Sequence, residues 1–491
     1  MSTTPVMAPP LTTPKPRKRR WLRVLLALLA LAILMPLGVI GYWIIGMPGA
    51  WTQAEEEAAQ EDPRWRLQDM QADRPVIADA DNSALKMMAM VRGGRVWVSG
   101  VPNYDLMFEK LPANSQLNSQ QVQVIQTEFA KMPKQLEQAR ELRKYPEGRF
   151  PVTFTDDWIS TVIQHHQDAR TVADWLKHDA MLRAQEGDYD GAVESCQAII
   201  NGGRAMKDDP FLITVLIRIA MQNIALDSLE RALAQGEASE ERLREMQAML
   251  EKEIEQSSFL IGMRGERAGH HYLFESIRDG KVKPRLMSMI SGGSVGIDSF
   301  DDWLSDNVPS TMLKHYPDHL HNMNQMVAAS KLPLHERGPT LTKIFREGRN
   351  SGNRVSKVLM PATDKVEKAD RRSQMQLRAM VVALACERYR MKHEEKRWPV
   401  TLDDLIKAKL LSAFPTDPID NQPLRYRQVK EGIVVYSLGF DEQDNQGNIQ
   451  RDRHLDPGVD LGYRLWNLDQ RRLPPLPPVG LPDPALGPMP R

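Results

Sequence analysis

Residues 211–236 read FLITVLIRIAMQNIALDSLERALAQG, and this stretch decides the fold class. Its polar residues Thr214, Arg218 and Gln222 fall four apart and the residues between them are apolar, a spacing that predicts a largely buried α-helix. Pro210 precedes it, near the first helical turn where proline is favoured. Arg218 interrupts the apolar run, so we expect the run to be too short to cross a membrane. The stretch therefore predicts the core helix of a mainly α protein.

The same helical spacing continues on both sides of this stretch, from about residue 119 onward. Helices are expected over 157–185, 192–201 and 239–263, whereas residues 286–338 predict irregular loops with short helices. The segment AQEGDYDGAVESCQAII resembles the middle of a tetratricopeptide unit. No similar segment recurs at a period of about 34 residues, so we expect one helical hairpin and not a repeat array. Low aromatic content fits a helical bundle.

A second apolar run, VLLALLALAILMPLGVIGYWII, occupies Val24–Ile45 and is 22 residues long. About 20 apolar residues suffice for a helix to cross the hydrocarbon of a bilayer. The alternative is a cleaved signal peptide, whose apolar core is about 7–15 residues long and precedes a small-residue cleavage site. Pro48 lies where that site needs a small residue. We therefore expect an uncleaved transmembrane helix at 24–45 that binds the lipid bilayer.

The charges around this run predict its orientation. Residues 1–23 carry six basic residues and no acidic one, whereas the first charges beyond the run are Glu55, Glu56 and Glu57. Basic clusters stay cytoplasmic, so the bulk of the chain is expected to be periplasmic or otherwise extracytoplasmic, on the cytoplasmic (inner) membrane. Residues 24–491 have a net charge of −6, which argues against a nucleic-acid partner.

Composition and pattern divide the chain into segments. We expect a disordered basic tail (1–23), a transmembrane helix (24–45), a stalk and irregular segment (46–118), a helical domain (119–357), an α+β module (358–466) and a Pro-rich disordered tail (467–491). The two cysteines, Cys196 and Cys386, provide no disulfide framework. They predict two separate buried thiols or a single bridge.

Two motifs contain residue types that are used in catalytic or metal sites. Gly292–Gly296 matches the nucleophile elbow G-x-S-x-G, but its helical surroundings favour a flexible glycine loop. His315, His319 and His321 offer imidazoles, yet Pro317 is expected to break the helical register that would align them. Adjacent histidine pairs are expected to point different ways on their helices: His165-His166 and His270-His271. An enzyme should show a concave pocket with convergent polar groups.

Near the C-terminus the pattern changes from helix to hairpin. Met375–Lys392 predicts a helix, and RWPVTLDDLIKAKLL predicts a short helix capped by Thr401. LRYRQ and GIVVYSLG alternate with period two around a Lys-Glu-Gly turn and predict an antiparallel hairpin, which an acidic loop follows.

This order resembles the C-terminal part of the G-type major pseudopilin of type II secretion systems. The matching residues are ALACERYRMKHEEKRWPVTLDDL, FPTDPIDNQPLRYR and VVYSLGFDEQDNQG, within about 375–450. Such runs also end larger membrane-anchored bacterial proteins of unknown role, which contain elements like RFPVTFTDDW, and the whole chain resembles that group. The N-terminus lacks the prepilin-peptidase glycine and the following glutamate, so assembly into a pseudopilus is not expected.

The resemblance implies a calcium site in the loop after the hairpin. By position, Asp441 and Asp444 match the acidic residues of that loop, with Asn445, Asn448 and the carbonyl of Leu438 nearby. Ca²⁺ takes six to eight oxygen ligands of these kinds. The alternative is an ordinary polar loop.

These observations favour a non-enzymatic envelope protein with an assembly or interaction role among other envelope proteins. One alternative is a membrane-tethered hydrolase with an unrecognised site in the helical domain. Another is an accessory component of a type II secretion-like apparatus.

Overall fold

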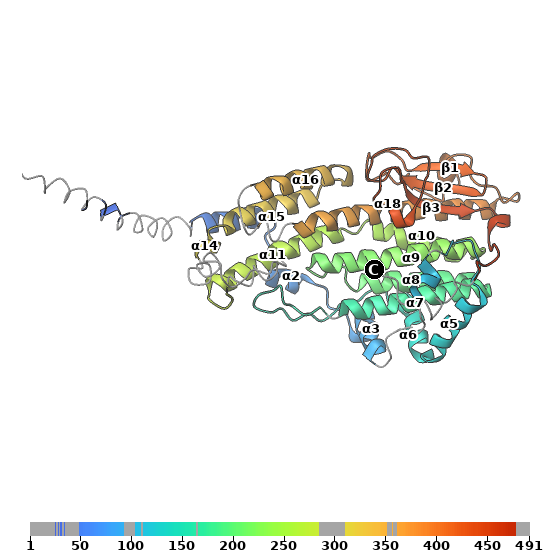
Figure 1. Ribbon diagram of the computed structural model, residues 1–491, viewed down its shortest axis with the longest axis horizontal. Coiled ribbons are helices and arrows are strands. Elements are labelled where there is room, and N and C mark those ends of the chain that lie inside the picture. The colour runs from blue at the N-terminus through green and yellow to red at the C-terminus, as the bar shows by residue number, and fades with distance from the viewer. Residues whose placement is uncertain are drawn as a thin grey trace, which may run out of the picture.

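The computed structural model describes residues 49–92, 104–109, 111–163, 165–283, 310–350 and 361–477, with residues 25, 28, 30, 31, 34 and 356. Long helices lie side by side along the long axis of the molecule, and a small sheet lies at one end (Figure 1). The prediction of a mainly α fold with a small β part is therefore confirmed. The predicted transmembrane helix at 24–45 lies almost entirely outside the described residues, and so does the glycine loop at 292–296.

Helix α9 (Leu212–Gln235) packs between the other long helices. Helices α7 (His165–Glu186) and α8 (Tyr189–Arg204) form the predicted hairpin, and both pack against α9. Gly187 takes a φ of 89° in the turn between them, a conformation that favours glycine. The Asp188 side chain then accepts a hydrogen bond from the backbone N–H of Gly191 (2.9 Å), which caps α8.

The prediction that α9 is buried is confirmed, but the reason given for excluding a membrane span was wrong. Within the described residues, α9 is the one helix with the length and composition of a membrane span, at 24 residues. Its most apolar window is 67 % buried inside the protein, as expected for a core helix. Its polar residues Thr214, Arg218 and Gln222 are buried as well, because each has a polar partner on another helix.

The single helix expected over 239–263 is two helices, α10 (Glu240–Ile254) and α11 (Ser258–Arg278), because the chain turns between them. Helix α11 packs against α15 (Tyr316–Ser330), which packs against α16 (Leu334–Asn350). Together with the short α14 (Ser310–Leu313), these helices occupy part of the segment predicted to be irregular. Pro317 lies in the first turn of α15 and starts this helix instead of breaking it.

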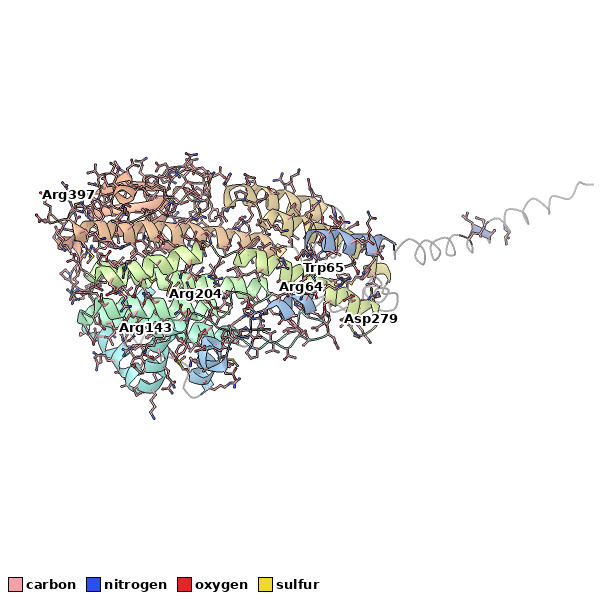
Figure 2. The ribbon with its side chains drawn as sticks, turned by 180° about the vertical axis from the view of Figure 1, so that it is seen from behind. Arg64, Trp65, Arg143, Arg204, Asp279 and Arg397 are labelled. Carbon is pink, nitrogen blue, oxygen red and sulfur yellow. The ribbon has the colours of Figure 1, made fainter. Side chains whose placement is uncertain are left out.

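The segment expected to be a stalk is folded against the body of the protein. A helix over 49–61 is followed by α2 (Leu67–Asp73), which packs on α11. Trp65 between them is fully buried, at the same end of the molecule as Asp279 (Figure 2). The next helices cover the outer side of α7 and α8: α3 (Ser83–Arg92), α4 (Tyr104–Glu109), α5 (Ser119–Ala130) and α6 (Pro133–Glu141).

The C-terminal region packs on the bundle through α18 (Pro361–Lys392), which contacts α9, α10 and the sheet. The predicted hairpin is confirmed as β1 (Arg425–Val429) and β2 (Gly432–Ser437), and β3 (Leu461–Trp466) adds a third antiparallel strand in the order β1-β2-β3. One apolar core runs from α7 through α18 to the sheet. The short helix α19 (Asp403–Lys407) has Leu402 at its N-cap position, with no side-chain cap, so the predicted cap at Thr401 is wrong.

Two further expectations concern the cysteines and the tail. Cys196 and Cys386 are both buried and free, so the separate-thiol prediction is confirmed. The disordered tail predicted from residue 467 is wrong for its first residues, since Leu473 pairs with the segment before α5. Its backbone N–H donates to the carbonyl of Asn114 (2.7 Å), and Gln116 donates to the carbonyl of Leu473 (2.9 Å).

Candidate functional site

The predicted calcium loop joins β2 to β3. The Asp441 carboxylate accepts hydrogen bonds from the backbone N–H of Gly458 (2.7 Å) and from Asn445 Nδ2 (3.0 Å). Its pKa lies below the usual value: burial acts to raise it, but the hydrogen bonds from Gly458 and Asn445 outweigh burial. Asn448 lies farther along the loop and donates from Nδ2 to the carbonyl of Gly458 (2.6 Å). The structure thus places Asp441 and Asn445 in contact, and Asp441 and Asn448 both form hydrogen bonds with the backbone of Gly458.

The other predicted ligands lie at the start of the same loop. Asp444 accepts hydrogen bonds from the phenol of Tyr436 (3.0 Å) and from the backbone N–H of Gln446 (2.8 Å). Leu438 donates its backbone N–H to the buried carboxylate of Asp417 (3.1 Å). The Asp444 carboxylate and the Leu438 N–H thus make hydrogen bonds that hold this part of the loop.

Sequence reasoning missed the carboxylate that lies deepest in this loop, that of Asp460. It is fully buried and accepts backbone hydrogen bonds from Asn445 (3.2 Å) and Gly447 (2.7 Å). Burial raises its pKa, and the nearby charge of Asp444 acts in the same direction. The available signal was an acidic residue directly before the alternating run LGYRLW. Asp441 and Asp460 therefore both accept hydrogen bonds from Nδ2 of Asn445, at 3.0 and 3.5 Å.

The three histidines expected on one segment do not converge. His319 is buried, with Nε2 3.0 Å from Nδ1 of His270 on α11 and Nδ1 3.2 Å from Ser356 Oγ. His321 points to the surface, where its Nδ1 lies 2.9 Å from a carboxylate oxygen of Glu57. Helix α15 therefore directs these imidazoles to different environments.

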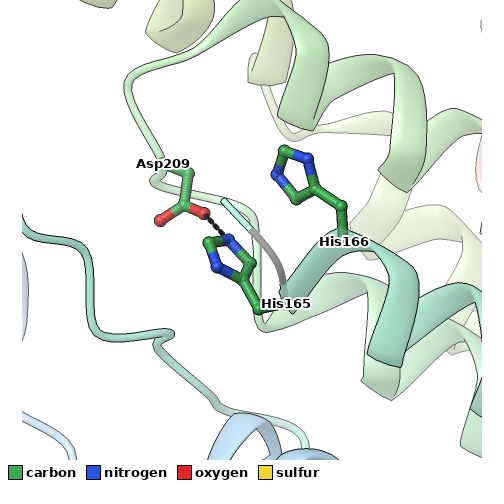
Figure 3. Close-up of side chains that lie close together, drawn as sticks. All are labelled: His165, His166 and Asp209. Atoms are coloured by element: carbon green, nitrogen blue, oxygen red, sulfur yellow. Dashed lines mark hydrogen bonds and ion pairs between the residues drawn. The ribbon is translucent and has the colours of Figure 1, made fainter. Parts of the chain in front are cut away.

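A cluster that the sequence did not predict lies where α7 begins (Figure 3). His165 Nε2 lies 3.3 Å from Asp209 Oδ2, and His166 Nε2 lies 2.7 Å from the hydroxyl of Thr214. The two imidazoles have different hydrogen-bond partners, Asp209 and Thr214. Contrary to the expectation that the pair points different ways, one nitrogen from each histidine and an Asp209 oxygen still lie within 4.8 Å of one another.

The charges around this cluster favour a structural role. Burial lowers the pKa of His166 to about 4, and the neighbouring His165 acts in the same direction, so His166 is neutral at pH 7. The other oxygen of Asp209 is bound by the buried guanidinium of Arg74, which also pairs with Asp208 (2.9 Å). Arg74 is shared between Asp208 and Asp209, so an ion pair already holds this cluster inside the protein.

Glu266 on α11 is a second group with an unusual pKa. Burial raises the pKa of this carboxyl to about 7, while the backbone N–H of Leu212 donates to it (2.9 Å). His270 lies one turn later, with Nε2 3.5 Å from Glu266 Oε2, and burial lowers its pKa to about 3. Such groups occur in active sites. Here His270 is buried against Trp158, with ring centroids 5.6 Å apart, whereas the side chain of Glu266 is 17 % exposed.

A cleft of about 390 Å³ lies where the bundle meets the C-terminal region. It is lined by the first turn of α11, the end of α15, the start of α16, the middle of α18 and the loop over 416–421. Its basic lining residues include Lys331, Arg337 and Arg378. Its two lining carboxylates, Asp370 and Asp417, are paired with arginines at 2.6 and 2.7 Å.

The cleft therefore has a positive lining. The N-terminus of α11 adds backbone N–H groups and the positive end of the helix dipole. Arg378 holds the rim by donating to the carbonyl of Thr416 (2.8 Å). Because its carboxylates are paired with arginines, this concave site is suited to binding an anionic group, and His335 also lines it.

Comparison of the chain with family models, with curated proteins and with solved structures finds no match.

Proposed function

We propose that this chain is a single-pass membrane protein of the cell envelope whose role is assembly or protein interaction and not catalysis. Residues 24–45 would anchor it in the cytoplasmic membrane with the N-terminus inside and the bulk of the chain outside. The uncharged run of 22 residues and the six basic residues before it support this placement.

The cleft between α11, α16 and α18 is the observation that carries the binding role. Cations and a helix N-terminus line it, and its carboxylates are paired. We infer that it receives an acidic segment of another envelope protein, because charge-assisted hydrogen bonds to arginine and backbone N–H groups recognise carboxylates. Helices α16 and α18, which contribute residues to this cleft, lie with the sheet on the side of the body away from α3 and α6 (Figure 1).

The experiment is a pull-down from detergent-solubilised membranes with matched charge reversals. Lys331→Glu changes an exposed lysine that lines the cleft, and Lys343→Glu changes an exposed lysine of α16 that does not. We expect Lys331→Glu to lose partners that the unmodified protein and Lys343→Glu both capture. Identical partners for all three proteins would contradict a role for the cleft.

Topology is tested separately. A reporter fused after Arg491 should be active only outside the cytoplasm, because the basic cluster at the other end of the chain stays inside. A mature protein that begins at Trp51, or its release by a high-salt wash, would contradict the anchor.

The same preparations distinguish the alternatives. Recovery of type II secretion-like components would support an accessory role in such an apparatus. Hydrolysis of chromogenic esters or phosphate esters by the purified protein would support a membrane-tethered hydrolase.

We also propose that the loop over 438–460 binds Ca²⁺. The resemblance to G-type pseudopilins supports this, and so do the carboxylates of Asp441 and Asp460, which both contact Asn445. An ion there would bridge β2 to β3 and stiffen the loop. The ligand set would comprise Asp441, Asp444, Asn445, Asn448 and the carbonyl of Leu438, with Asp460 as an additional oxygen donor.

A further inference from the structure

At the end of the bundle that begins with the helix over 49–61, one histidine faces two carboxylates from different parts of the chain. Nε2 of His271 on α11 lies 3.4 Å from Glu275 Oε2, one turn later on the same face. Glu55 comes from the N-terminal helix. One atom from each of these three side chains lies within 4.8 Å of the others.

The imidazole of His271 is fixed by its surroundings. Its Nδ1 is hydrogen-bonded to the phenol of Tyr316, and its ring centroid lies 4.5 Å from that of Trp65. When Nδ1 carries the proton, it donates to the phenol oxygen and leaves the Nε2 lone pair directed at the carboxylates. This arrangement, in which a second group holds the other ring nitrogen, is the usual one for a histidine that binds a metal.

The Nε2 atom of His271 makes no well-formed hydrogen bond among the described residues, and the nearest charged atom printed for it is Glu275 Oε2 at 3.4 Å. The residue is only 1 % exposed, so water does not freely satisfy this nitrogen. A buried polar atom that lacks a well-formed hydrogen bond is costly, and a cation between this nitrogen and the carboxylates would satisfy both.

The carboxylates supply the negative charge for that cation. Glu55 is held by Trp51 Nε1 (2.5 Å) and Arg66 Nη2 (3.0 Å). Glu275 lies 3.4 Å from Nε2 of His271 and 3.6 Å from a guanidinium nitrogen of Arg278. A carboxylate has about four lone-pair sites, so it can bind an arginine and a metal together.

A metal could reach this site from solvent. The side chains of Glu55 and Glu275 are 20 % and 31 % exposed, whereas that of His271 is buried at the base. The arginines lie on the outer side of the carboxylates, where solvent screens their charge.

We propose that Glu55, His271 and Glu275 bind one divalent transition metal of the zinc type. One imidazole and two carboxylates provide three protein ligands, and the fourth position is left for water or an external ligand. The bound metal would tie the helix over 49–61, which follows the apolar run, to α11 of the bundle. This inference is independent of the proposed binding role of the cleft.

The test uses the full-length, tag-free protein in detergent, stripped of metal with a chelator. Zn²⁺ is titrated by calorimetry, and Co²⁺ is used as a probe of four-coordinate geometry through its visible absorption. We expect the unmodified protein to bind one more equivalent of Zn²⁺ than the double variant Glu55→Gln with Glu275→Gln. Tyr316→Phe should weaken this site by about 10- to 100-fold, because it removes the group that orients His271.

Glu56→Gln is the matched control, since this exposed glutamate neighbours Glu55 on the same helix. It should bind Zn²⁺ as the unmodified protein does. Far-ultraviolet circular dichroism checks that the double variant is folded. We expect it to fold, because Glu55 and Glu275 are partly exposed in the unmodified protein. Equal stoichiometry and affinity in the unmodified protein and the double variant would overturn the proposal and would place any metal elsewhere, for example at His165 and His166. Absence of Zn²⁺ binding to the unmodified protein would overturn it as well.

Discussion

Arg471 and Glu387 form a two-point ion pair in the interior, with Nη1–Oε1 3.0 Å and Nη2–Oε2 2.9 Å. Their side chains are only 3 % and 0 % exposed. Arg471 also donates to the carbonyl of Gly236 at the end of α9 (2.8 Å). The pair therefore joins the segment after β3 to α18 and to the bundle.

We expect Arg471→Gln to lower the free energy of unfolding by about 1–3 kcal/mol, because it removes two buried charge-assisted hydrogen bonds and leaves Arg390 as the remaining arginine on Glu387. Urea unfolding followed by circular dichroism measures this change. Arg397→Gln is the control: Arg397 projects from the surface (Figure 2), its side chain is 62 % exposed, and the change should cost less than about 0.5 kcal/mol. Equal unfolding midpoints for the two variants would show that the buried pair is not a stabilising contact.

The second prediction concerns α9. Ile217 is 8 % exposed in the core, and Ile217→Asp should unfold the bundle because an unpaired buried charge costs several kcal/mol. A polar residue such as Gln222 would tolerate the same change if it faced solvent. In the structure Gln222 Nε2 donates to Glu253 Oε2 (2.9 Å), so Gln222→Asp would set two carboxylates against each other. We expect it to destabilise strongly.

Ile213→Asp is the control for α9, since Ile213 is 45 % exposed. It should melt within a few degrees of the unmodified protein. If Gln222→Asp melts like Ile213→Asp, the contact between Gln222 and Glu253 does not form.

The third prediction is a pH dependence from His166. Its pKa is about 4 in the folded protein, against an ordinary value near 6.5 in the unfolded chain. Between these values the unfolded state binds more protons, so stability should fall as the pH is lowered from about 6.5 to 4. Chemical denaturation at a series of pH values measures the slope, which His166→Gln should reduce. His321→Gln, with a side chain 51 % exposed, should leave the slope unchanged. Equal slopes for the unmodified protein and His166→Gln would refute the assignment.

The fourth prediction concerns Ca²⁺. If the loop binds it, thermal melts of the full-length protein should shift upward in millimolar calcium relative to chelator. Calcium at about 100 times its dissociation constant adds about 2.7 kcal/mol. The shift should vanish when Asp441→Asn and Asp444→Asn are combined, because calcium affinity depends on the number of charged ligands. Persistence of the shift in that double variant would place the calcium elsewhere, and equal melts of the unmodified protein in the two buffers would leave the loop without a site.

Much of the secondary structure was predictable because it depends on local spacing. The apolar pattern around Arg218 predicted a buried α9, and the period-two runs predicted β1 and β2. The same spacing could not show that 239–263 contains a break, since the turn between α10 and α11 interrupts neither apolar face. It also could not show where the polar residues of α9 point, because a buried polar stripe and an exposed one have the same sequence pattern.

The sequence by itself determined the helical class, the hairpin of α7 and α8, the β1–β2 turn and the presence of two apolar runs, because each depends on residues close together in the chain. Only the tertiary structure decided which polar groups meet. Glu253 accepts hydrogen bonds from Arg204 and Arg218, and Asp460 accepts one from the backbone N–H of Gly447. Glu55 lies close to His271. These residues lie far apart in sequence, and their approach follows from how the helices pack around a shared core, which no local periodicity records.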